Sequence, residues 1–492
     1  MDTKIITEYY KLCLFSIVTS IVTYGFALTN YSLSVDSETP INSEFAMSLG
    51  RWGTNLVRYR IFEGHLPYFT LLLGLLLFSL TAVELAKLFN FKGTMGYVFC
   101  GLFLTFPQMS YQLIFTMQAD VITLGFLLAV LSVTIFMKNS DVVFSKTSIF
   151  YFILSSLLLM FVIALYQALI LVPVIVFIIL FLQNSYNENF NFKTEFRRGI
   201  FFSALLLVSV ILYYLSAKIL CPVPESGLLS SYLSGETDNQ FLNACSVWFK
   251  NLVGNFYYGN KLFIIAFLIS LFLFVKFGIE KKFFAIRFVS LFLLLILPFG
   301  FSFFITNGYH PPRIYLTAGL VFAFVIVHFI SSIKYEQHAV FFCAIICTVN
   351  LYFITNLFYS NYKIFNHDKA EANKMNNLMQ AKYPEFDEKV NYVYFYGYLP
   401  YEHHQKFRIN KSEIFGGSLF NWDKGDNYRI INFFKFNDIA YYKLIDNKET
   451  YLKIKDSISS MPIWPTKESV KLINNVMVVK LGNEKGMPLW VE

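Results

Sequence analysis

The sequence contains a series of apolar runs that are long enough to cross a lipid bilayer as helices, and they fill most of its first 359 residues. A transmembrane helix needs roughly 20 predominantly apolar residues, and in lipid every backbone polar group must form its hydrogen bonds within the protein. Hydrophobic residues make up 56% of the 492 residues and charged residues only 15%, which excludes an ordinary soluble globular protein. We therefore predict a polytopic α-helical membrane protein.

We expect about eleven transmembrane helices in this part of the chain. Their approximate positions are 12–29, 66–86, 94–106, 120–137, 149–165, 168–183, 199–216, 262–277, 288–305, 314–330 and 338–357. The apolar run from Phe150 to Leu182 is too long for one helix, so we divide it at Tyr166 and Gln167 into two short helices joined by a tight turn. The first run has no signal-peptide cleavage pattern, and we expect it to be retained as an anchor.

Lysine and arginine are distributed unequally between the loops on the two sides of the predicted membrane domain. The loops of one side carry Lys4, Lys11, Lys87, Lys92, Lys138, Lys146, Lys193, Arg197, Arg198, Lys276, Lys281, Lys282, Arg287 and Lys334. The shorter opposite loops, 107–119, 166–167 and 306–313, contain only Arg313. Cytoplasmic loops carry the excess of positive charge, so we place the N-terminus in the cytoplasm and, after an odd number of spans, the C-terminus in the periplasm of a bacterial inner membrane.

The composition changes abruptly after Tyr359, where a mixed polar and aromatic sequence begins. Alternating stretches such as 390–396 and a final apolar run at 476–481 are typical of strands in a folded domain. We therefore divide the chain into a transmembrane domain, 1–359, with a large first periplasmic loop at 30–65, and a C-terminal periplasmic α/β domain, 360–492.

The second half of the loop 30–65 has the pattern of an amphipathic helix. Phe45, Leu49, Trp52 and Leu56 recur at helical spacing, while Arg51, Asn55 and Arg58 line another face. Such a helix lies in the membrane interface, where its cations reach lipid phosphates. The pattern alone also fits an ordinary interfacial helix whose charges are only solvated.

Two carboxylates, Asp36 and Glu38, follow the outer end of the first predicted span and precede this arginine-bearing helix. A carboxylate at this depth can act as a general base on an acceptor hydroxyl, while arginines stabilise a departing lipid phosphate. The spacing of two residues does not say which carboxylate is the base. We expect Arg51 and Arg58 to bind the phosphate, and Glu44 and Trp52 to contact substrate.

Further polar residues gather on the outer side of the predicted membrane domain, which suggests a cavity open to that side. We expect Gln118, Asp120, Tyr166 and Gln167 to bind substrate. We expect His310 and Arg313 to bind a phosphate together, as a clamp. Two alternatives stay open, namely that Gln118 and Asp120 only cap a helix and that His310 belongs to a rigid turn beside its prolines.

The cysteines and the histidines give weaker indications. Cys221 and Cys245 bracket a polar loop assigned to the periplasm, and we predict a disulfide between them. The histidines show no metal-ligand spacing, so we predict no metal site and no cofactor. Nucleic-acid binding is also excluded, because the net charge of +8 is not gathered in a basic cluster with exposed aromatic residues.

The N-terminal motifs resemble a known family. Tyr24-Gly25-Phe26, the stretch from Asn30 to Glu38 and Leu49-Gly50-Arg51-Trp52-Gly53 are similar to the start of the phage-encoded, serotype-converting O-antigen glucosyltransferases, the type II Gtr family. That family is placed among the GT-C-like membrane glycosyltransferases that use polyprenyl-phosphate sugars. The resemblance is sharp over roughly the first 70 residues and architectural afterwards, where the Tyr166-Gln167 pair and the C-terminal domain also fit.

The resemblance implies a catalytic role for Asp36 and Glu38 and contact between the Arg51 region and the lipid phosphate. It also implies undecaprenyl-phosphate glucose as the donor and a periplasmic lipopolysaccharide O-antigen sugar as the acceptor. A separately made flippase and a donor-lipid synthase would be functional partners. Two other readings remain open, namely a transporter or flippase of lipid-linked sugars and an O-antigen polymerase or ligase.

For the C-terminal domain we expect a role in acceptor selection, because aromatic rings commonly stack on sugars while polar side chains bond the hydroxyls. The candidate groups are Tyr392, Tyr394, Tyr396, Tyr398, Tyr401, the stretch from Phe420 to Asp423, Trp464, Trp490, and Lys480 or Lys485. The alternative is that the alternate tyrosines form one packed face of a strand.

Overall fold

The computed structural model describes residues 3–38, 43–138, 145–221, 240–305, 310–333, 336–445 and 448–487. The chain divides into two compact units, Met1–Thr29 with Ile41–Thr355, and Asn30–Pro40 with Asn356–Glu492. The division at Asn356 lies four residues before the predicted one. Residues 30–40, which we assigned to the transmembrane domain, belong instead to the second unit.

The first unit is helical, and each of the eleven predicted spans corresponds to a helix. These helices are α1 (Thr3–Thr29), α4 (Pro67–Leu88), α5 (Thr94–Thr105), α7 (Ala119–Met137), α8 (Lys146–Leu165), α9 (Leu171–Asn184), α10 (Phe192–Leu220), α13 (Phe263–Glu280), α14 (Phe284–Ile296), α15 (Ala318–Ile330) and α16 (Glu336–Lys382). Within the described residues, nine helical segments are long and apolar enough to cross a membrane, while α5 and α15 are too short to meet that criterion. The chain is thus a polytopic membrane protein by the length and composition of its helices.

The predicted break in the long apolar run is confirmed. Helix α8 ends at Leu165, Tyr166 has an extended backbone with φ −160° and ψ 118°, and the 3-10 helix η4 (Gln167–Ile170) leads into α9. The break leaves two helices where the uninterrupted run would have formed one that is too long for the bilayer.

Short elements connect the long helices of the first unit. They are α2 (Ser43–Ser48), α3 (Trp52–Asn55), the π-helix η1 (Leu56–Ile61), η2 (Pro107–Met109), α6 (Ser110–Leu113), η3 (Thr116–Gln118), α12 (Gln240–Leu252), η5 (Asn260–Leu262), η6 (Leu297–Phe303) and η7 (Pro312–Ile314). The single amphipathic helix predicted around Trp52 is therefore wrong, because the chain turns at Gly50. Gly50 has φ +71°, and the amides of Gly50 and Arg51 bond back to the carbonyls of Met47 and Ala46, which is the usual glycine-terminated end of a helix.

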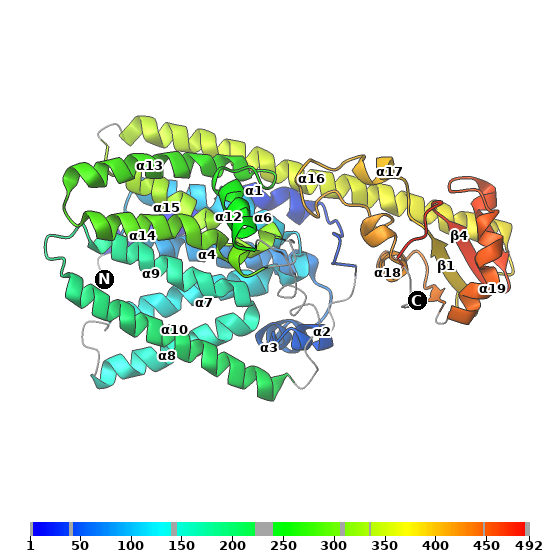
Figure 1. The fold of residues 1–492 in the computed structure, drawn as a ribbon, viewed down its shortest axis with the longest axis horizontal. Coiled ribbons are helices and arrows are strands. Elements are labelled where there is room, and N and C mark those ends of the chain that lie inside the picture. Colours follow the sequence, from blue (N-terminus) through cyan, green and yellow to red (C-terminus); the bar gives the residue numbers. More distant parts are fainter. Residues whose placement is uncertain are drawn as a thin grey trace. The chain divides into compact units, whose positions relative to one another are not determined.

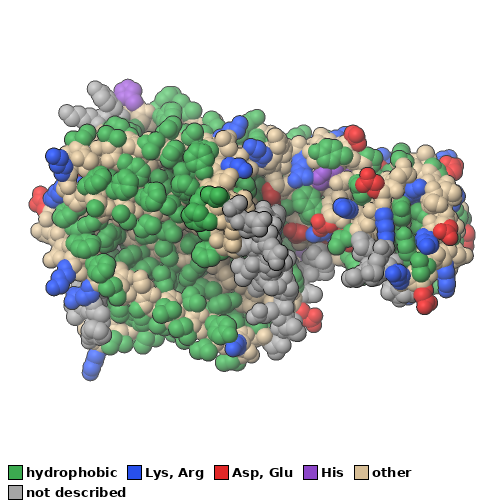
Figure 2. Space-filling model, viewed as in Figure 1, with side chains coloured by type: hydrophobic (Ala, Val, Ile, Leu, Met, Phe, Trp, Pro, Cys, Tyr) green, Lys and Arg blue, Asp and Glu red, His purple; other side chains and the backbone are tan. Residues whose placement is uncertain are grey.

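Helix α4 is central to the packing, because it contacts α1, α5 and α7, and α8 contacts both α7 and α10 (Figure 1). A Cβ atom at Gly74 of α4 would lie 2.9 Å from the backbone of Ala119 on α7, so the absent side chain permits the close approach of these helices. Hydrophobic side chains cover the middle of the helical face in Figure 2. Leu268 and Phe272 of α13 are exposed apolar side chains, as expected for contact with lipid.

The second unit contains a four-stranded sheet with the order β2-β1-β4-β3, and it has the α/β composition that we predicted. Its strands are β1 (Tyr392–Tyr396), β2 (Lys443–Leu444), β3 (Val470–Ile473) and β4 (Val476–Lys480), and its shorter helices are α17 (Tyr401–Gln405), η8 (Trp422–Lys424), α18 (Asn427–Phe436), α19 (Lys448–Ser459) and η9 (Lys467–Ser469). Strand β1 pairs in parallel with β2 and β4, and β3 and β4 are antiparallel. Residues of α16 from Asn356 onward also belong to this unit.

The alternate tyrosines of β1 face a hydrophobic core. Tyr394 is buried against Ile454 and Ile458 of α19, with Tyr392 and Tyr396 partly buried against the same cluster. The alternative of one packed face is therefore correct for these three residues. Their side chains hold the strand to α19 and are not the sugar-binding surface that we considered.

Candidate active site

Asp36 lies in a tight turn of the second unit. The Ser37 amide donates to the Ser34 carbonyl at 3.0 Å, and the hydroxyls of the two serines are 2.8 Å apart. Asp36 has φ +70°, a conformation that short polar residues tolerate better than most. The segment before the turn is held by Asn361 of α16, whose Nδ2 donates to Ser32 Oγ at 3.0 Å. The turn thus presents its carboxylates from a fixed backbone.

Arg429 of α18 joins the two predicted catalytic carboxylates. Its Nη2 is 2.9 Å from Asp36 Oδ1, and its Nη1 forms an ion pair with Glu38 Oε1. Its Nε lies 2.8 Å from Asp423 Oδ2, so three carboxylates surround one guanidinium. The sequence indicated Asp36 and Glu38 as neighbours but gave no signal for Arg429, and it suggested a sugar-binding role for Asp423 instead of this ion pair.

The two predicted catalytic carboxylates differ in their environment. The side chain of Glu38 is 0% exposed and that of Asp36 is 37% exposed. Burial raises the pKa of Glu38 to about 7, against the opposing effect of the nearby Arg429 charge. Glu38 Oε2 has no hydrogen-bond partner among the described residues. A carboxylate with these properties can exchange a proton near neutral pH.

The first unit brings Arg51 together with the Tyr166-Gln167 pair. Arg51 Nε donates to Gln167 Oε1 at 3.1 Å, and the Arg51 guanidinium lies 4.7 Å from the centre of the Tyr166 ring. Gln167 Nε2 in turn donates to the Leu49 carbonyl at 2.7 Å. Three of the residues predicted to meet substrate therefore form one cluster, where a stacked and hydrogen-bonded arginine has a defined orientation.

Arg58 is buried, whereas we placed it on an exposed helix face. Its Nη1 is 3.5 Å from Asp120 Oδ2, and both side chains are 2% exposed. Neither Asp120 oxygen has a hydrogen-bond partner among the described residues. Gln118, the residue before α7, forms no side-chain cap hydrogen bond. Arg58 belongs to η1, whose Val57 is buried in one hydrophobic cluster with residues of α7 and α8, so a lipid phosphate would meet Arg58 only inside the protein.

His310 and Arg313 face different rings. His310 is buried, its centre lies 6.5 Å from that of Phe256, and neither ring nitrogen has a hydrogen-bond partner among the described residues. Burial also lowers the pKa of His310, which favours the neutral ring. Arg313 lies 5.4 Å from the centre of the Phe115 ring. Residues 306–309 of the predicted turn lie outside the described residues.

The remaining predicted contacts are dispersed. Glu44 is exposed at the start of α2, and Trp52 donates from Nε1 to Ser216 Oγ at 3.1 Å. Lys485 is exposed, with its Nζ 5.9 Å from the centre of the Tyr451 ring.

Two residues suggested for acceptor binding lie in the interior. Lys480 is buried, and its amine donates to the carbonyls of Met461 and Ser459, so its suggested contact with a phosphate or hydroxyl is wrong. Trp464 is also buried and donates to Glu371 at 2.8 Å. Trp490 lies outside the described residues.

The predicted disulfide is absent from the structure. Cys221 and Cys245 are both free cysteines. Cys221 follows the last residue of α10, and its Sγ is 4.0 Å from Sδ of Met47, so the thiol lies against α2. The two thiols are therefore separate groups in this fold.

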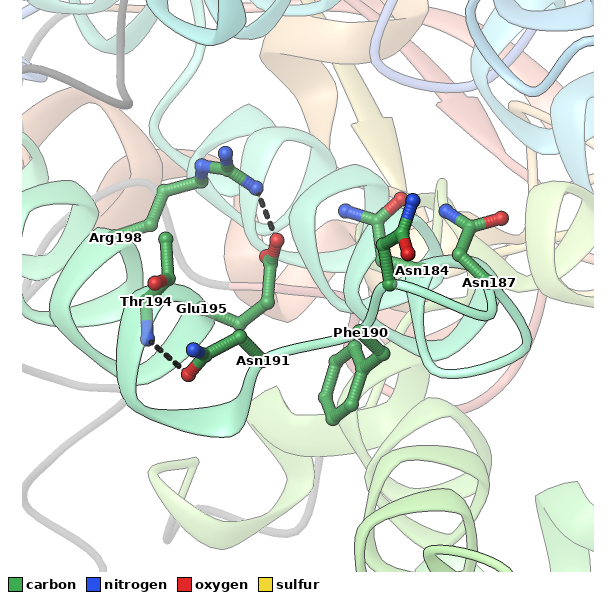
Figure 3. A pocket seen from close by; sticks show the side chains of 8 residues that line it. Asn184, Asn187, Phe190, Asn191, Thr194, Glu195 and Arg198 are labelled. Carbon is green, nitrogen blue, oxygen red and sulfur yellow. Dashed lines mark hydrogen bonds and ion pairs between the residues drawn. The ribbon is translucent and has the colours of Figure 1, made fainter.

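A polar pocket of about 350 Å³ lies where α9 leads into α10 (Figure 3). It is lined by Asn184, Asn187, Asn189, Phe190, Asn191, Thr194, Glu195 and Arg198. Glu195 and Arg198 form an ion pair at 2.5 Å. The pocket contains none of the predicted site residues and belongs to a loop that the charge distribution assigns to the cytoplasm. Among the described residues, no group of three or more His, Cys, Asp or Glu side chains is arranged to hold a metal ion.

Comparison with known proteins gives one family. The model of the family described as glucosyl transferase GtrII matches residues 25–328. No curated protein matches the chain. The matched segment includes Asp36, Glu38, Arg51, Arg58 and His310, whereas Arg429 lies beyond it.

Proposed function

The chain belongs to the GtrII glucosyl transferase family, and from this premise we propose that it transfers glucose from undecaprenyl-phosphate glucose to a sugar of the lipopolysaccharide O-antigen in the periplasm. The resemblance of the N-terminal motifs supports the donor and the acceptor. The distribution of Lys and Arg between the loops supports a periplasmic reaction at the inner membrane. A separate synthase and a separate flippase would supply the lipid-linked donor on that side.

The observation that carries this proposal is the pair Asp36 and Glu38. The two carboxylates are close together in sequence, and both form ion pairs with the guanidinium of Arg429. In the transfer, the acceptor hydroxyl gives its proton to a carboxylate, and its oxygen bonds to C1 of glucose. The bond between C1 and the phosphate oxygen breaks, and undecaprenyl phosphate departs with the electron pair. The carboxylate raises the nucleophilicity of the hydroxyl, which is general base catalysis.

We assign the proton to Glu38 and contact with the acceptor to Asp36. A base works best when its pKa is near the working pH, and the pKa of Glu38 is raised to about 7 by burial. Its Oε2 atom has no partner among the described residues, whereas both Asp36 and Glu38 Oε1 are engaged by Arg429. Asp36 is the more exposed carboxylate, so we assign it the first contact with the acceptor, whose hydroxyl then gives its proton to Glu38 on the same turn.

The departing phosphate needs positive charge or hydrogen-bond donors. Arg51 is partly exposed and is oriented by Gln167 and Tyr166, so it is our first candidate for binding the donor phosphate. Arg58, His310 and Arg313 remain proposed phosphate ligands. Arg58 and His310 are buried, so they would act on a phosphate that enters the helical unit.

For the acceptor we retain the second unit as the selecting element. Tyr401 is 68% exposed, and Trp422 precedes Asp423, which contacts Arg429. Aromatic rings of this unit that reach its surface are suited to stacking against the apolar face of a sugar. Glu44, Trp52, Gln118, Asp120 and Lys485 remain further proposed substrate contacts.

Conversion of the O-antigen in cells tests the catalytic pair. The variants Asp36→Asn and Glu38→Gln should each abolish glucose addition, measured by mass spectrometry of the isolated O-antigen, while the protein remains in the membrane. Asp456→Asn removes an exposed carboxylate of α19 and should convert the O-antigen like the natural protein. If both amide variants kept near-normal glucose addition, the carboxylate mechanism would have to be abandoned.

A further inference from the structure

Arg429 occupies a position that is unfavourable for helix stability. Asp426 is the N-cap of α18 and accepts a hydrogen bond from the Tyr428 amide at 2.9 Å, so Arg429 lies in the first turn of the helix. The N-terminus of a helix carries partial positive charge, and acidic residues are favoured there over arginine. The helix itself therefore does not favour a cation at this position, whereas the three carboxylates that the side chain meets do.

The backbone that carries Arg429 is anchored to the sheet. Asn427 is buried and exchanges two hydrogen bonds with Phe395 of β1, accepting from its amide at 2.7 Å and donating to its carbonyl at 2.8 Å. Ile430 and Phe433 of the same helix are fully buried. The opposite partner, the turn with Asp36, is fixed by Asn361. Both sides of the contact are therefore set by packed elements of the same unit.

The donors of Arg429 are divided among its partners. Asp423 takes the Nε–H, Asp36 takes a hydrogen from Nη2, and Glu38 Oε1 takes one from Nη1. A planar guanidinium fixes the angles between these three contacts, which the point charge of a lysine would not do. This arrangement holds the Glu38 carboxylate through one oxygen and leaves its Oε2 atom unbonded among the described residues.

We propose that Arg429 is a positioning residue of the transfer reaction, which holds Asp36 and Glu38 side by side and orients Oε2 of Glu38 toward the acceptor proton. The inference rests on the proposed function and extends it to a residue beyond the segment that matches the family. Asp423 supports Arg429 by accepting a hydrogen bond from its Nε. Arg429 does not touch the reacting atoms in this assignment.

A pH effect follows from the charges around Glu38. Arg429 opposes the rise in the pKa of Glu38, while Asp36 on the same turn adds to it. Loss of the guanidinium removes the favourable charge and leaves the two carboxylates to repel each other. Glu38 then holds its proton to higher pH, so transfer is lost at neutral pH and partly regained in alkaline buffer.

The test measures initial rates of glucose transfer by the full-length protein in proteoliposomes between about pH 5.5 and about pH 9, with undecaprenyl-phosphate glucose and isolated O-antigen. Arg429→Gln should lower the rate at about pH 7 by at least about tenfold. It should also move the rising limb of the plot of rate against pH to higher pH by about one unit or more. Arg429→Lys keeps the charge, so its limb should stay close to that of the natural protein at a reduced rate. Lys435→Gln, an exposed cation of the same helix, is the matched control and should change neither quantity.

An unchanged rate and pH profile in Arg429→Gln would overturn the inference, and so would a rate loss that is equal at every pH. If Arg429→Gln is absent from the membrane, Arg429→Lys and Asp423→Asn decide instead. Both should be slower than the natural protein, and full activity in both would overturn the inference. Failure of the proposed function is a separate result, because the natural protein would then transfer no glucose.

Discussion

We expect Glu38 to lower the stability of the second unit above neutral pH, and we expect its replacement by glutamine to remove that effect. The side chain is 0% exposed, and burial raises its pKa from 4.5 to about 7. An acid with a raised pKa binds its proton more tightly in the folded state than in the unfolded chain. Its stabilising contribution is therefore complete below about pH 4.5, decreases as the pH rises, and is lost above about pH 7.

The size of the effect follows from the change in proton affinity. Each tenfold change is worth about 1.4 kcal/mol, so the rise to about 7 corresponds to roughly 3 kcal/mol. Glutamine is neutral at all pH values and resembles the protonated acid. Glu38→Gln should therefore match the natural protein at about pH 4.5 and exceed its stability at about pH 8 by up to roughly 3 kcal/mol, although it transfers no glucose.

Thermal unfolding of the full-length protein in detergent, followed by intrinsic fluorescence, measures this difference. About 1 kcal/mol moves the Tm of a unit of this size by roughly 2–4 °C, so the predicted gain is readily observed. Asp456→Asn is the matched control and should show no pH-dependent gain. A Tm for Glu38→Gln that lies several degrees below that of the natural protein at about pH 8 would contradict this prediction, because the contact with Arg429 would then outweigh the cost of burial.

Three further predictions concern the rest of the chain. Asp120→Asn leaves Arg58 buried without its counter-ion and should destabilise the helical unit by about 3–5 kcal/mol, measured as a lower Tm. The double variant R58M/D120L should recover stability but should not transfer glucose. A Tm unchanged by Asp120→Asn would contradict this prediction. A reporter active only in the periplasm should be active after Asn361 and silent after Arg198, and reversed activity would overturn the topology. Exchanging 356–492 together with 30–40 for the segments of a relative with another acceptor should change the sugar that is modified, and an active chimera that keeps the original sugar would place selection in the first unit.

The membrane helices could be predicted from sequence because lipid imposes a strict rule of length and apolarity on each of them. The break at Tyr166 followed from the same rule. The prediction of one helix around Trp52 was wrong because the spacing of apolar residues does not reveal a single residue at positive φ, which here is Gly50. Apolar spacing describes a face, and it does not show where the backbone turns.

The candidate site was predictable only in part. Asp36 and Glu38 could be found because they are near each other in sequence and lie in a recognisable motif. Arg429 is 391 residues from Glu38, so only the folded chain brings them together. Lys480 illustrates the reverse case, because a lysine in the last strand was expected to face substrate and instead bonds the backbone inside the unit. Tertiary packing determines the contacts of both Arg429 and Lys480, and the sequence does not reveal that packing.

Cell-free transfer is the most direct measurement of the proposed activity. Purified full-length protein in proteoliposomes receives undecaprenyl phosphate carrying radiolabelled glucose, and isolated O-antigen is supplied as acceptor. Label should appear in the polysaccharide with the natural protein and should be absent with Glu38→Gln. Label that crosses the bilayer but never enters the polysaccharide would show a transporter of lipid-linked sugar and would contradict the proposed glucose transfer.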